Sequence, residues 1–193
     1  MKVVGINGSP KKDGNTALLI RAVFQELEKE GIETELIQLG GQAVRGCMAC
    51  YKCAERRDGQ CINQKDNINE CIVKMAEADG IILGSPTYYA DVTAEMKAFI
   101  DRAGIVGKYN GYLFRHKAGA ALTALNRGGA IHTLDTMNHF MHNMQMFLVG
   151  STYWNMVFGM KTGEVAQDEK GMENLRVLGQ NMAFLLQKLQ GCF

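Results

Sequence analysis

Apolar residues along this chain follow two different spacings in turn. Short runs that are mostly apolar or β-branched have the composition of strands. These runs lie at residues 1–6, 32–39, 80–84, 117–124 and 146–152. Between them, apolar positions recur every three or four residues, which is the spacing of helices that bury one face. The helical segments lie at residues 16–27, 66–76, 93–102, 130–144 and 168–189.

This alternation of strand and helix predicts an α/β fold, a doubly wound, five-stranded parallel sheet between two layers of helices. The strand order 2-1-3-4-5 fits it, and ligands of such sheets bind at the carboxyl ends of the strands. The chain of 193 residues shows no repeat or linker, so we expect one domain, residues 1–193. Residues 40–66 have neither spacing, and the length of this loop indicates a function or a bound group.

The turn after the first predicted strand is the most informative segment. Residues 5–16 read Gly-Ile-Asn-Gly-Ser-Pro-Lys-Lys-Asp-Gly-Asn-Thr. A strand, a tight turn and a helix start place unpaired N–H groups and the positive end of a helix dipole around one point, which predicts a phosphate site. Hydroxyl, amide and ammonium groups add further donors there. They belong to Ser9, Lys11, Asn15 and Thr16.

Two common phosphate motifs do not match this turn. The P-loop needs G-x-x-x-x-G-K-S/T, but Gly8 and Gly14 are one residue too far apart and Asn15 follows Gly14. The dinucleotide pattern G-x-G-x-x-G is absent as well. A terminal monophosphate that needs no magnesium, such as that of FMN, fits better. The alternative is an ordinary strand-to-helix turn that uses Ser, Pro, Asp and Gly for local reasons.

A second turn, Ser-Pro-Thr-Tyr-Tyr, follows the third predicted strand and suits a flavin ring. Pro86 stiffens the backbone, and the hydroxyl of Thr87 can hydrogen-bond to ring heteroatoms. Tyr88 or Tyr89 offers a flat face for stacking. The alternative is a turn with two core or interface tyrosines.

A third turn, Asn-Arg-Gly-Gly, follows the fourth predicted strand. The Arg127 cation and the backbone N–H groups near Gly128 would stabilise a reduced flavin, which tends toward an anion, or bind the phosphate of a nicotinamide. An exposed loop arginine with no ligand is an equally good interpretation.

Four cysteines within the long loop form the second strong signal. Their spacing is C-x2-C-x2-C-x7-C, over Cys47, Cys50, Cys53 and Cys61. Successive sulfurs at this spacing can each take one corner of a compact inorganic core, which predicts a [4Fe–4S] cluster. Zinc held by four thiolates, a redox-active thiol pair, or a loop without a metal remain alternatives. Cys71 lies on the apolar face of a predicted helix and is expected in the core.

The composition restricts the classes of binding partner and the cellular compartment that we expect. Lys and Arg number 21 against 20 Asp and Glu, with no basic stripe, which argues against nucleic acid. No apolar segment approaches the length of a membrane span, and the strand-like N-terminus leaves no room for a signal peptide. Six cysteines in such a chain favour reduced thiols or metal ligands over disulfides. We therefore expect a cytoplasmic protein.

The three turns, in this order over about residues 1–155, resemble the flavodoxin-like NADPH-dependent FMN reductase family. The cysteine spacing is similar to that of its iron–sulfur flavoprotein branch. The resemblance implies FMN, with phosphate contacts from the first turn and ring contacts from the second. It also implies electrons from NAD(P)H, a cluster that passes electrons to FMN, and a homodimer or homotetramer with the flavin near a subunit interface. By this likeness the phosphate contacts fall on Ser9, Lys11, Asn15 and Thr16, and the ring contacts on Pro86, Thr87, Tyr88 and Tyr89.

Three functions follow from these observations. The first is an oxidoreductase in which NAD(P)H reduces FMN, and a quinone, a free flavin or the cluster takes the electrons. No protein side chain is expected to be catalytic, because the flavin carries the chemistry. The second is an electron carrier that exchanges electrons with ferredoxin-like partners. The third is a zinc-stabilised binding domain, which the flavin turns make a poor fit.

Overall fold

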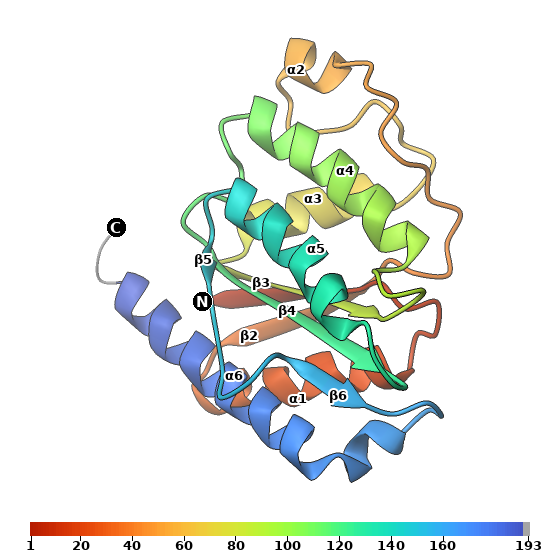
Figure 1. Cartoon of the computed structure of the whole chain (residues 1–193). Helices are drawn as coiled ribbons and strands as arrows, with labels where there is room; N and C mark the ends of the chain where they lie inside the picture. Colours follow the sequence, from red (N-terminus) through yellow and green to blue (C-terminus); the bar gives the residue numbers. More distant parts are fainter. Residues whose placement is uncertain (191–193) are drawn as a thin grey trace.

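A computed structural model describes residues 1–190 and shows a parallel sheet between two layers of helices (Figure 1). The strands pair in the order β2-β1-β3-β4-β5, and β6 pairs with β4, so the predicted flavodoxin-like order is confirmed. The strands are β1 (Lys2–Asn7), β2 (Glu33–Gln38), β3 (Gly80–Pro86), β4 (Ala118–Leu125), β5 (Phe147–Leu148) and β6 (Met156–Phe158).

Helices cover both faces of the sheet. Helices α1 and α6 pack on one face, and α3, α4 and α5 on the other (Figure 1). The helices are α1 (Asn15–Lys29), α2 (Lys52–Arg56), α3 (Ile68–Glu77), α4 (Ala94–Tyr109), α5 (Ala130–Asn143) and α6 (Glu169–Leu189), with a 3-10 turn at Glu164–Gln167. None of the described helices is both long enough and apolar enough to cross a bilayer.

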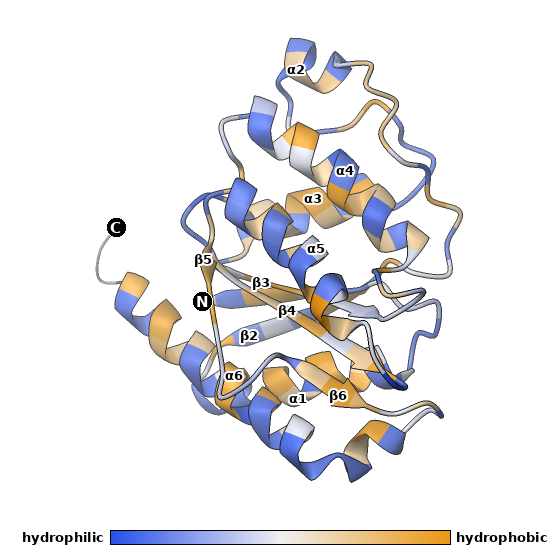
Figure 2. Cartoon of the chain, viewed as in Figure 1, coloured by the Kyte–Doolittle hydropathy of each residue, from blue (hydrophilic) through white to orange (hydrophobic). Residues whose placement is uncertain are grey.

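The core forms where the two central strands meet both helical layers. Every residue of β4 is buried, and β3 is buried except at Pro86. Figure 2 shows both strands as apolar, which is the pattern of parallel strands covered on both faces. Cys71 lies in this core, as predicted, and burial raises the pKa of its thiol to about 12. The sixth cysteine, Cys192, lies outside the described residues.

The predicted end of one helix was wrong. The spacing predicted a helix over residues 93–102, but α4 continues to Tyr109. Ala103 and Val106 continue its buried face, so packing extends the helix beyond Arg102.

The predicted fifth strand, residues 146–152, was also wrong in its extent. Only Phe147 and Leu148 pair with β4 before the chain leaves the sheet, and it returns as β6. The cause is the buried side chain of Asn174 on α6. Its oxygen accepts hydrogen bonds from the hydroxyls of Ser151 and Thr152 at 2.7 and 2.9 Å. By leaving the sheet after Leu148, the chain brings the hydroxyls of Ser151 and Thr152 to the oxygen of Asn174.

Candidate functional site

All three predicted turns contribute to one cavity of about 240 Å³ at the carboxyl edge of the sheet. We call it the edge cavity. Its lining includes Ser9, Lys11, Asn15, Thr16, Pro86, Thr87, Tyr88, Asn126, Gly159, Met160 and Thr162. A wider hollow of about 960 Å³ lies between β6 and the start of α6, and it contains none of the predicted site residues. The edge cavity is therefore the site that the sequence motifs share.

The first turn presents an open helix N-terminus to the edge cavity. Gly14 is the N-cap of α1 and has no side chain to cap it. The first backbone hydrogen bond runs from Leu18 N–H to the Gly14 carbonyl, so the N–H groups before Leu18 precede the helical ladder. An anion placed there would meet these N–H groups and the positive end of the helix dipole.

The hydroxyl of Thr16 is the strongest sign that this turn holds a ligand. Thr16 is 1% exposed, and its Oγ1 has no hydrogen-bond partner. A buried polar atom without a partner destabilises a fold unless something else satisfies it. Ser9, which is 5% exposed, accepts a hydrogen bond from Lys11 N at 3.2 Å and keeps its own hydroxyl proton to donate. Both hydroxyls fit a phosphate at the helix start.

The side chain of Asn15, for which a phosphate contact is predicted, bonds to the segment after β6. The amide donates to the carbonyls of Gly159 and Lys161 at 3.1 and 2.9 Å, and its oxygen accepts from Gly163 N at 2.8 Å. These bonds hold the segment after β6 against the phosphate turn. That segment supplies Gly159 and Met160 to the cavity wall, which no local sequence signal indicated.

The second turn is fixed through its threonine. The hydroxyl of Thr87 lies 3.0 Å from that of Thr123 on β4 and accepts from Thr133 on α5 at 3.1 Å. The predicted hydrogen bond from this hydroxyl to a flavin ring therefore competes with two protein partners. Thr87 anchors the turn between β4 and α5, and its contact with a flavin ring stays a prediction.

The two tyrosines of the second turn are placed differently. Tyr88 lines the edge cavity and is half exposed, whereas Tyr89 is fully exposed. Tyr88 and Asp91 exchange backbone hydrogen bonds, and the two residues between them, Tyr89 and Ala90, both have positive φ angles, 47° and 63°. This turn type favours Asn and Gly, so Tyr and Ala here store backbone strain. Tyr88 is the better placed of the two for ring stacking.

The third turn touches the second but presents different residues from those predicted. Gly129 begins α5 with φ of +84°, and a Cβ there would meet Ala90 Cβ at 2.8 Å. Only a glycine allows the two turns this contact. Asn126 lines the edge cavity, while Arg127 and Gly128 are exposed and outside its lining. Their contact with a flavin or nicotinamide stays a prediction.

The four predicted metal ligands line a second, smaller cavity, here called the cysteine cavity. Cys47 and Cys50 are exposed, Cys53 is buried, and Cys61 is half-buried. In residues 1–190, no three His, Cys, Asp or Glu side chains stand close enough together to hold a metal ion. The thiols therefore share one cavity without forming a finished site.

Local features of this loop suit sulfur ligands. The backbone N–H of Ala49 donates to Cys47 Sγ at 3.4 Å. Ala49 and Tyr51 have positive φ angles of 51° and 55°, and strain of this kind concentrates at functional loops. Burial raises the pKa of Cys53, and the nearby Cys61 and Cys47 raise it further. Without a metal, the Cys53 thiol is therefore kept neutral.

Helix α4 connects the two cavities. At its start, Thr93 caps Met96 N and donates to the Gly8 carbonyl of the phosphate turn at 2.8 Å. At its end, the ring of Tyr109 packs edge-on to Tyr51, and Asn110 binds the Cys53 carbonyl. The helix starts at the sheet edge and runs toward α2 (Figure 1). One rigid element thus positions both sites.

Comparison with known proteins agrees with this geometry. Residues 1–161 match the NADPH-dependent FMN reductase family. The chain is 37% identical over 190 residues to an iron–sulfur flavoprotein of Methanocaldococcus jannaschii, covering 95% of this chain and 96% of that protein. It is 31% identical over 193 residues to an iron–sulfur flavoprotein of Methanosarcina thermophila, covering 98% and 97%.

A solved structure shows the same fold. The flavodoxin, WrbA-like protein from Agrobacterium tumefaciens superposes with a TM-score of 0.66 at 18% identity, over 97% of each chain. The family match and the relatives show that the chain belongs to the NADPH-dependent FMN reductase family of flavin-dependent oxidoreductases.

Proposed function

We propose that this protein binds FMN in the edge cavity, receives electrons from NAD(P)H, and passes them to an iron–sulfur cluster in the cysteine cavity. The observation that carries the proposal is the unpartnered Thr16 hydroxyl at an uncapped helix start, in a cavity shared with the Pro86–Tyr88 turn. Two relatives of similar length are named iron–sulfur flavoproteins, which supports the second cofactor.

The residues of the edge cavity divide the binding of FMN between them. Ser9 and Thr16 would hold the phosphate with the N–H groups of α1, and the Lys11 ammonium would balance its charge. Tyr88 would cover one part of the ring, and Asn126 offers an amide elsewhere in the lining. FMN supplies the chemistry itself, since it accepts a hydride and releases its electrons in one or two steps. The protein's task is to position the ring and leave one face open to the nicotinamide.

The donor set of the cysteine cavity fits a [4Fe–4S] cluster. Four thiols line it, the remaining lining is largely apolar, and Cys47 already receives a backbone N–H. A cluster of this kind stores one electron at a time. Cys47 and Cys50 are exposed, so this side of the loop is open to an electron acceptor. Zinc would use the same four thiolates but would take no electrons.

The electron donor is tested by anaerobic reduction of the FMN-loaded protein. Adding NADPH or NADH is expected to bleach the visible flavin absorption within seconds, because the proposed site leaves a ring face accessible. The same sample then receives a quinone, which should restore the absorption. A flavin that only reduced ferredoxin bleaches would overturn the nicotinamide proposal and favour the second candidate, an electron carrier between ferredoxin-like proteins. The exposed cysteine loop is the feature that would favour that candidate.

A further inference from the structure

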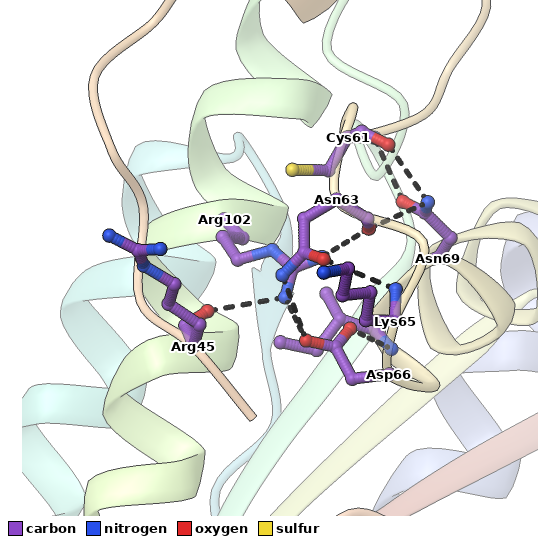
Figure 3. Close-up of polar contacts among 8 residues, drawn as sticks. Arg45, Cys61, Asn63, Lys65, Asp66, Asn69 and Arg102 are labelled. Atoms are coloured by element: carbon purple, nitrogen blue, oxygen red, sulfur yellow. Dashed lines mark hydrogen bonds and ion pairs between the residues drawn. The ribbon is translucent and has the colours of Figure 1, made fainter. Parts of the chain in front are cut away.

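A buried arginine stands at the wall of the cysteine cavity. Arg102 of α4 is 1% exposed, and Asp66, its ion-pair partner, has a 2% exposed side chain (Figure 3). Its Nη1 donates to Asp66 Oδ2 at 2.5 Å and to the Arg45 carbonyl at 3.2 Å. Its Nη2 donates to the Asn63 carbonyl at 2.8 Å. Arg45 and Asn63 lie just outside the two ends of the cysteine segment, so Arg102 holds both ends of that segment against α4.

One nitrogen of this guanidinium is left over. Arg102 Nε is buried and has no hydrogen-bond partner. The residue lines the cysteine cavity together with all four thiols. Arginine stays protonated at every pH at which the protein is folded. The guanidinium is therefore a permanent cation with one N–H that needs an acceptor.

Cys61 is held firmly beside this cation. Its backbone N–H donates to Asn69 Oδ1 at 2.8 Å, and its carbonyl accepts from Asn69 Nδ2 at 2.9 Å (Figure 3). Asn69 belongs to α3, and Arg102 to α4. The Cys61 backbone is thus held by α3, and that of Asn63 by Arg102 of α4. Cys47 and Cys50, by contrast, are exposed.

We propose that Arg102 Nε–H donates a hydrogen bond to sulfur of the four-cysteine centre, at Cys61 or at the inorganic core, and so raises its reduction potential. This inference rests on the proposed cluster. A tetrathiolate cluster is an anion, and reduction adds a further negative charge. A charged donor in a buried site stabilises the more negative state, and hydrogen bonds to the sulfurs are known to set cluster potentials. Asp66 pairs with the guanidinium through Nη1 and leaves the Nε–H of this cavity-lining residue without an acceptor.

The test is a redox titration of anaerobically reconstituted protein, followed by EPR of the reduced cluster. Arg102→Lys keeps the charge but has no Nε–H, and Arg102→Gln removes both. Each is expected to change the ratio of reduced to oxidised cluster at a fixed potential by at least tenfold toward the oxidised form, about 59 mV for one electron. Arg45→Gln is the matched control, because Arg45 is exposed and only its carbonyl meets Arg102. The control should keep the parent potential.

Measuring iron and sulfide distinguishes failure of the proposed cluster from failure of the proposed Arg102 hydrogen bond. Parent protein without iron would overturn the proposed cluster, and this inference with it. Full iron in all three variants, with the parent potential in both Arg102 variants, would overturn the role of Arg102 alone. If the Arg102 variants do not fold, the hydrogen bond is tested in the parent protein labelled with ¹⁵N in the arginine guanidino groups. A ¹⁵N hyperfine coupling to the reduced cluster supports the hydrogen bond, and its absence contradicts it.

Discussion

Thr16→Val is expected to weaken FMN binding by more than tenfold, and Ser9→Ala to cause a second loss of similar size. Valine keeps the shape and burial of Thr16 but removes the hydroxyl whose oxygen has no partner in the protein. A hydrogen bond to a charged phosphate contributes about 1.5–3 kcal/mol, and about 1.4 kcal/mol corresponds to tenfold in affinity. Quenching of flavin fluorescence during titration of the apoprotein measures both losses.

The free energy of unfolding of the Thr16→Val apoprotein provides a second test of the same hydroxyl. Removing an unsatisfied buried hydroxyl should leave the free energy of unfolding of the apoprotein unchanged or slightly higher. Thr34→Val is the matched control, because Thr34 lies on β2, outside the edge cavity. Its FMN affinity should equal that of the parent. Unaltered affinity in Thr16→Val would exclude the phosphate from this turn.

Cys50→Ala is expected to abolish iron incorporation in anaerobic preparations while FMN binding persists. A four-iron cluster needs four thiolates, and Cys50 is the middle ligand of the C-x2-C-x2-C run. The edge cavity has no cysteine in its lining, so the affinity for FMN should stay at the parent value when the iron is lost. Iron, sulfide and FMN per chain are measured on the same sample.

Cys71→Ala is the control for the cysteine prediction. Cys71 is fully buried in the core and is not part of the lining of the cysteine cavity, and its thiol pKa of about 12 keeps it neutral. This variant should lower stability by leaving a small void, yet hold as much iron as the parent. Equal iron content in Cys50→Ala and the parent would contradict the proposed four-cysteine cluster.

The strand order and the position of the phosphate turn could be predicted because both depend on local pattern. The apolar runs of β3 and β4 and the Gly-Ser-Pro turn before α1 are contiguous in sequence. Parallel topology then brings the carboxyl ends of neighbouring strands together without further information. The position of Tyr88 in the lining of the edge cavity follows from this topology.

Features that depend on distant partners could not be predicted. Asn15 reads as a phosphate donor until residues 159–163 are seen to occupy its side chain. The hydroxyl of Thr87 reads as a ring contact until Thr123 and Thr133 lie beside it. Arg102 reads as the end of a helix, because nothing near it in sequence indicates its bonds to residues 45–66. In each case a polar side chain serves a segment tens of residues away.

We expect, above all, that the turn after β1 binds the phosphate of FMN. Titrating the apoprotein with FMN and with riboflavin tests it most directly, because the two ligands differ only in that phosphate. We predict that FMN binds at least about a hundredfold more tightly, since two or more charge-assisted hydrogen bonds are involved. The difference should shrink in Thr16→Val. Equal affinity for FMN and riboflavin in the parent protein would contradict the account.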